Sequence, residues 1–120
     1  MLNLKDYEMH KALVDAYTLG PAPSTASGIL KTAAQTMKER AASRDRVEVG
    51  ERSMKRAVEA FNALTGAALS EVQGWQFMAV LKLARANGGK FHLDDYVDGA
   101  AYMALAGEAA SAECNKLEAY

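Results

Sequence analysis

The chain has 120 residues, with 14 Lys and Arg against 15 Asp and Glu and a formal net charge of −1. This length suits one domain with a single core. The balanced charge excludes the basic excess that general duplex-DNA binders usually show, so the sequence carries no strong nucleic-acid signal. Its single cysteine, Cys114, excludes an intrachain disulfide and a cysteine-rich zinc site.

The sequence has no apolar run typical of a signal peptide, and no stretch approaches the roughly 18 apolar residues of a membrane span. We therefore expect a cytoplasmic protein with no membrane partner. Half of the residues are hydrophobic, and the only prolines are Pro21 and Pro23. Because proline is the strongest helix breaker, this composition favours long helices.

The pattern predicts an all-α fold, a four- to five-helix bundle with an amino-terminal helical arm. The arm covers residues 1–19, and a linker over 20–28 follows because Pro21 and Pro23 disfavour helix. The bundle covers 29–120. Short connections between its helices favour antiparallel neighbours.

Within the bundle, apolar residues with helical spacing predict a helix from about Ser27 to Ala42 and another from about Glu51 to Leu64. We interpret the charged stretch between them as a structured loop. The inward residues expected on these two helices are Ile29, Leu30, Ala33, Ala34, Met37, Met54, Ala57, Val58, Phe61 and Leu64.

Two further helices complete the prediction. Ser70 and Gln73 form a capping-box pattern, which begins a helix over residues 71–86, and Gly88-Gly89 ends it. The last helix starts near Leu93 and extends to about residue 117. Its many small residues, together with the arm, offer apolar surface that a thin bundle leaves uncovered, so we expect a homodimer.

The start of the last helix carries the acidic residues Asp94, Asp95 and Asp98. On a helix, Asp98 lies four residues after the first and three after the second, so the three carboxylates repel one another unless something neutralises them. A divalent cation such as Mg²⁺ is one solution. A helix cap with a salt bridge to Lys82 or Arg85 of the preceding helix is the other.

Lys82 and Arg85 lie three residues apart on an otherwise apolar helix. Such side chains either extend their charges past the core into water or form a clamp for phosphate. Tyr102, four residues after Asp98, is placed to hydrogen-bond that carboxylate or to stack on a base.

The loop that carries Asp45, Arg46, Glu48 and Glu51 mixes both signs of charge. A charged loop at one end of a bundle is either a solvated turn or a site for a ligand or partner. In the second interpretation Arg46 binds phosphate, and Glu48 and Glu51 space two carboxylates for a metal.

The combination Asp45-Arg46 before Gly50, then Lys82 with Arg85, then Asp95, Asp98 and Tyr102 resembles a small-protein family of unknown function from tailed phages and prophages. The resemblance covers about Ile29 to Glu108. That family is in turn distantly similar to the MazG-like all-α nucleoside-triphosphate pyrophosphohydrolases.

The MazG resemblance implies an oligomeric helical bundle that holds Mg²⁺ through two carboxylate motifs and cuts nucleotides between the α and β phosphates. Here Glu48 and Glu51 stand for the first motif, although they flank a glycine, and Asp95 and Asp98 stand for the second. Whether the chain is an enzyme stays open at this point. The alternatives are a nucleotide-sequestering protein and a non-enzymatic phage accessory protein that binds a host or phage protein.

Overall fold

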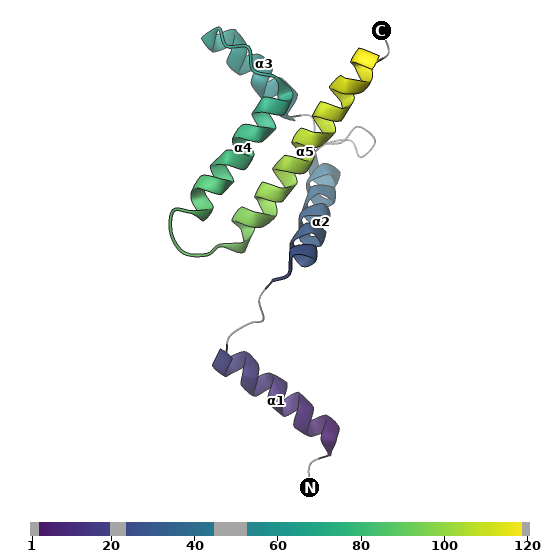
Figure 1. The fold of residues 1–120 in the computed structure, drawn as a ribbon, viewed down its shortest axis with the longest axis vertical. Coiled ribbons are helices and arrows are strands. Elements are labelled where there is room, and N and C mark those ends of the chain that lie inside the picture. The colour runs from purple at the N-terminus through teal and green to yellow at the C-terminus, as the bar shows by residue number, and fades with distance from the viewer. Residues whose placement is uncertain (1–2, 20–23, 45–52, 119–120) are drawn as a thin grey trace.

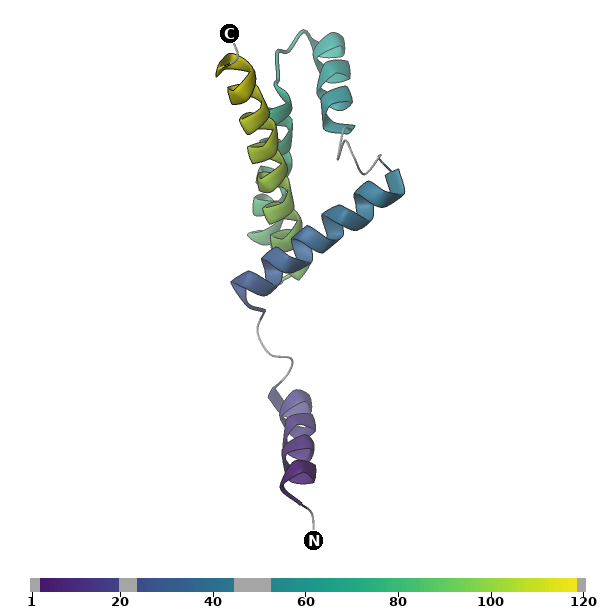
Figure 2. The same cartoon turned by 90° about the vertical axis from the view of Figure 1, so that its right-hand side faces the viewer.

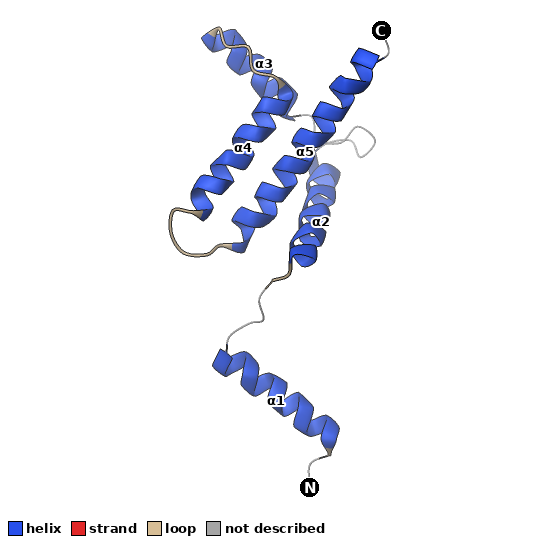
Figure 3. Ribbon diagram, viewed as in Figure 1, coloured by secondary structure: helices blue, strands red, loops and turns tan. Residues whose placement is uncertain are grey.

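The computed structural model describes residues 3–19, 24–44 and 53–118, which form five α-helices and no strand (Figure 3). In chain order these are α1 (Leu4–Leu19), α2 (Ala26–Arg44), α3 (Ser53–Thr65), α4 (Glu71–Ala86) and α5 (Leu93–Glu118). The predicted all-α class is therefore confirmed. None of the described helices combines the length and the apolar character that crossing a bilayer requires.

An antiparallel pair, α4 and α5, forms the centre of the fold (Figure 1). The predicted capping box begins α4, because the Ser70 hydroxyl accepts the Gln73 N–H at 3.1 Å and the Gln73 side chain accepts the Ser70 N–H at 3.0 Å. At the other end of α4, the N–H of the C-cap residue Asn87 donates to the Leu83 carbonyl at 3.2 Å. The turn after it reverses the chain into α5.

Of the helices that pack together, α2 and α5 are the farthest apart in the sequence, and they cross at a wide angle (Figure 2). The buried residues at the crossing are Ala33, Val97 and Ala101, and Ile29, Met37 and Ala100 pack around them. Alanines on both helices let the two backbones approach closely. This contact makes α2 part of the body, whereas α1 lies apart from it and contacts no other described helix.

A small residue also determines how α3 packs on α4. A Cβ atom at Gly74 would lie 2.7 Å from Val58 Cγ1 and closer still to the Met54 sulfur, so only glycine leaves room for α3. The turn between them is held by Asn62, whose side chain donates to the Leu69 carbonyl and accepts the Leu69 N–H, both at 2.9 Å. Gly66, with φ of +75°, ends α3 in the left-handed region.

Two details of the prediction are corrected. α2 begins at Ala26, inside the expected linker, because Thr25 accepts the Gly28 N–H at 3.0 Å and so caps the helix. Several residues expected to point inward are exposed, because α2 and α3 each pack against one neighbouring helix and not inside a closed bundle. The exposed fractions are 61% for Leu30, 48% for Phe61 and 86% for Leu64.

Candidate functional site

Ion pairs connect three helices near the middle of the molecule. Lys82 Nζ on α4 lies 3.0 Å from Asp98 Oδ2 on α5, and Arg40 on α2 places a guanidinium nitrogen 3.7 Å from Asp98 Oδ1. The Lys82 and Asp98 side chains are only 11% and 14% exposed, so water screens this pair weakly. We call these three residues the ion-pair chain.

A second pair lies nearer the turn between α4 and α5. Arg85 Nε is 3.5 Å from Asp95 Oδ1, close enough for electrostatic attraction. Among the described residues, however, no donor makes a hydrogen bond to that oxygen, although the Asp95 side chain is only 3% exposed. We interpret the contact as charge proximity without hydrogen-bond alignment, since 3.5 Å is long for a charge-assisted bond.

These contacts show how the acidic residues of α5 are neutralised. Of the two solutions that the sequence left open, the salt bridges to Lys82 and Arg85 are present. Around Asp98, two cations, Lys82 and Arg40, face one carboxylate, so the surroundings of Asp98 carry an excess of positive charge. An anion gains more from such surroundings than a bare metal cation does.

The described residues contain no group of three or more His, Cys, Asp or Glu side chains arranged to hold a metal ion. Four of the residues predicted for the site, Asp45, Arg46, Glu48 and Glu51, lie outside the described residues. Asp94 is exposed in the first turn of α5, where the positive end of the helix dipole favours a carboxylate.

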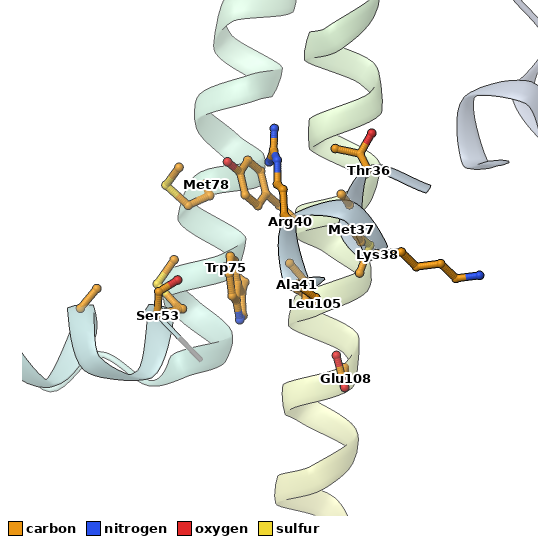
Figure 4. A pocket seen from close by; sticks show the side chains of 14 residues that line it. Thr36, Met37, Lys38, Arg40, Ala41, Ser53, Trp75, Met78, Leu105 and Glu108 are labelled. Atoms are coloured by element: carbon orange, nitrogen blue, oxygen red, sulfur yellow. The ribbon is translucent and has the colours of Figure 1, made fainter. Parts of the chain in front are cut away.

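A pocket of about 470 Å³ opens beside the ion-pair chain, and we call it the aromatic pocket. Four helices line it, and Figure 4 shows their side chains in close-up. Its lining consists of Thr36, Met37, Lys38, Arg40 and Ala41 of α2, Ser53, Met54 and Ala57 of α3, Trp75 and Met78 of α4, and Ala101, Tyr102, Leu105 and Glu108 of α5.

The inner wall of the aromatic pocket is a ring pair. Trp75 is 5% exposed, and its ring centroid lies 5.9 Å from that of Tyr102, with an angle of 23° between the ring planes. Tyr102, which was expected to bond Asp98 or to stack on a base, therefore already stacks on Trp75. Lys38 points away from Trp75 and Met78 (Figure 4), whereas Arg40, which also lines the pocket, belongs to the ion-pair chain.

The sequence analysis assigned no role to Arg40. A signal for Arg40 existed, because it lies three residues after Met37 and so at the edge of the apolar stripe of α2. Nothing in the sequence indicated that α2 crosses α5 at Asp98, since the crossing depends on small residues far apart in the chain. The pairing of Arg40 with Asp98 is visible only in three dimensions.

Residues 28–110 match the model of a family described as a domain of unknown function, DUF6378. The chain belongs to this family. No curated protein and no solved structure matches the chain. The DUF6378 domain begins inside α2 and ends inside α5, so it contains the ion-pair chain and the whole aromatic pocket. It leaves α1 outside.

Proposed function

We propose that this DUF6378 protein is a MazG-like phage protein that binds a nucleotide together with Mg²⁺ in the aromatic pocket. The observation that supports the proposal is the pocket itself, which joins an aromatic wall to the exposed cation of an ion-pair chain. A nucleotide has the same two parts, a flat ring and an anionic phosphate. Nucleotides and Mg²⁺ are abundant in the cytoplasm, where we expect the protein.

The apolar half of the pocket suits a base. Its volume of about 470 Å³ falls within the range of small-molecule sites. The methionines Met37, Met54 and Met78 line it beside Trp75 and Tyr102. Thioethers are polarisable and adapt to the shape of a ring, so this wall accepts a planar group without a rigid preformed slot.

The charged half suits phosphate. The Arg40 side chain is 51% exposed and its contact with Asp98 is long at 3.7 Å, so most of its donors are available to a ligand. Lys82 forms an ion pair with Asp98 at 3.0 Å, and Asp98 in turn orients the Arg40 guanidinium. A planar guanidinium placed this way gives two parallel hydrogen bonds to a phosphate.

The MazG resemblance adds Mg²⁺ and hydrolysis to the proposal. Of its four metal ligands, Asp95 and Asp98 belong to the described residues, and each already faces a basic side chain. They accept a metal only if Lys82 and Arg85 exchange partners, for example with the phosphates of the nucleotide. Binding is therefore the core of the proposal, and pyrophosphate release is its extension.

The test is a thermal-shift screen of nucleoside mono-, di- and triphosphates, with and without Mg²⁺. A ligand that binds only the native state raises the melting temperature. We expect a base-dependent rise that Mg²⁺ increases, that Arg40→Gln abolishes, and that the control Lys31→Gln retains, because Lys31 is an exposed residue of the same helix that does not line the pocket.

A flat screen, or an equal rise in both variants, would contradict the proposed site. If a nucleotide binds, chromatography of the incubated ligand separates the two versions of the function. Release of pyrophosphate indicates hydrolysis, whereas recovery of unchanged nucleotide indicates sequestration.

A second candidate function is the binding of a host or phage protein, and the arm favours it. α1 contacts no other described helix, and its Leu4, Tyr7 and Met9 are 73%, 58% and 62% exposed. Apolar side chains this exposed gain free energy when a partner covers them. Capture of a specific lysate protein, lost in Leu4→Asp, supports this function, and failure to capture any protein counts against it.

The same exposed arm supports the proposed homodimer, together with the distal part of α5. A Cβ atom at Gly107 would meet nothing within 4 Å, so another helix has room to approach there. Light scattering at several protein concentrations tests this. We expect the mass of two chains, and a single-chain mass throughout the series would overturn the proposal.

A further inference from the structure

A second pocket, of about 680 Å³, lies between α4 and α5 and shares no lining residue with the aromatic pocket. On α5 its residues Asp95, Gly99 and Met103 recur every four positions, which places them on one side of the helix. The aromatic-pocket residues of α5, Ala101, Leu105 and Glu108, lie on the other side. We call the second pocket the outer groove.

The walls of the outer groove are apolar. They consist mainly of Ala79, Val80, Leu83, Ala86, Tyr96, Ala100 and Met103. Val80 is 58% exposed and Leu83 is 63% exposed, so no described segment covers them. Tyr96 stacks on Phe91 with ring centroids 5.7 Å apart, which extends the apolar wall toward the α4–α5 turn.

Two charged residues, Asp95 and Lys82, interrupt this apolar lining, and they differ in how closely an opposite charge approaches them. Lys82 Nζ is engaged 3.0 Å from Asp98. Asp95 Oδ1 is buried and accepts no hydrogen bond from any described residue. A buried carboxylate oxygen without a donor costs free energy, so it will favour a ligand that supplies one.

Arg85 supplies a positive charge near Asp95 Oδ1 but donates no hydrogen bond to it. Its Nε stays 3.5 Å from Asp95 Oδ1, and its side chain is 59% exposed. An exposed arginine turns away into water at little cost. A ligand cation can then take the place of Arg85 and form the shorter bond that Arg85 does not make.

We propose that the outer groove binds a small organic amine, whose ammonium group donates to Asp95 Oδ1 while its apolar body lies against Val80, Leu83 and Met103. The buried oxygen accepts no hydrogen bond and so calls for a donor, and the negative charge of Asp95 selects a cation over a neutral donor. The face of Tyr96 adds attraction for a cation in the same space. This inference does not depend on the proposed nucleotide site.

Hexylamine and hexanol, measured by calorimetry or NMR titration on the full chain, test the proposal. The two probes share an apolar chain and differ in the charged donor. We expect hexylamine to bind at least about tenfold more tightly than hexanol, as one charge-assisted hydrogen bond provides. Equal affinities for the two probes, or no binding of hexylamine, would overturn the proposal.

Variants locate the contact. We expect Asp95→Asn to lose the preference for the amine, while Asp94→Asn, at the exposed neighbouring position, keeps it. Arg85→Gln should bind hexylamine more tightly than the unmodified chain, because it removes the competing cation. Undiminished preference in Asp95→Asn, or weaker binding in Arg85→Gln, would contradict the assigned role of Asp95.

If Asp95→Asn does not fold, a second pair of variants tests whether the amine binds in the outer groove. Val80→Lys places a cation on the groove wall at an exposed position, whereas Phe77→Lys places one on the same helix at an exposed position that does not line the groove. We expect the first to lose hexylamine binding and the second to retain it. Equal binding by both would overturn the proposal.

Discussion

The two sides of the α4–α5 hairpin carry similar apolar side chains but have different surroundings. On one side, α2 and α3 cover Trp75, Val97 and Ala101, which are 5%, 6% and 6% exposed. On the other side, Phe77 and Val80 stay 68% and 58% exposed. Hydrophobic periodicity alone does not distinguish these sides, because each helix presents apolar residues around most of its circumference.

The comparison teaches that stability and binding are separated in this molecule. Substitutions on the covered side should cost folding free energy, and those on the open side should cost almost none. The ion-pair chain lies at the boundary, because Arg40 reaches the aromatic pocket and Lys82 reaches the outer groove.

The largest effect should come from the buried ring on the covered side. Trp75→Ala removes a 5% exposed indole that stacks on Tyr102, and such truncations cost about 4 kcal/mol. Phe77→Ala, two residues along the same helix, should change the free energy of unfolding by less than about 0.5 kcal/mol. Urea denaturation of both variants measures the contrast, and similar losses would show that something covers the open side.

A smaller effect should follow from breaking the pair at the boundary. Lys82→Met leaves the 14% exposed Asp98 side chain with only the long contact to Arg40, and removing one partner of a largely buried pair costs about 3 kcal/mol. The exposed Lys90→Met is the control, with an expected change below about 0.5 kcal/mol.

A double-mutant cycle identifies the cause of that loss. Adding Asp98→Asn to Lys82→Met should restore part of the stability, because the buried charge is then gone. If the two substitutions instead add their separate costs in urea denaturation, the pair is not coupled and its assigned role is wrong.

The smallest effect should come from the close approach of α3. Gly74→Ala forces Val58 and Met54 to move, and this overpacking exceeds the gain in helix propensity, for a net loss of about 1 kcal/mol. Gly107→Ala, at an open position, should instead stabilise the protein by up to about 1 kcal/mol. Thermal unfolding of the two variants shows the opposite signs, and equal signs would contradict the packing of α3 on Gly74.

The sequence by itself determined the local features of this protein. Apolar spacing located all five helices, and the Ser70–Gln73 capping box located the start of α4 at Glu71. It also offered Lys82 and Arg85 as partners for the acidic start of α5, with a metal ion as the alternative, because a short turn between two helices restricts which residues can face each other. These features depend on residues that are near one another in the chain.

Only the tertiary structure decided which apolar faces became core. Leu64 and Ala33 both follow the helical pattern, yet one is 86% exposed and the other 4%, because α2 has a neighbour at Ala101 and no described helix packs over the end of α3. Arg40 joined the site for the same reason. Its contact with Asp98 spans 58 residues of chain (98 − 40), and no local preference encodes such a contact.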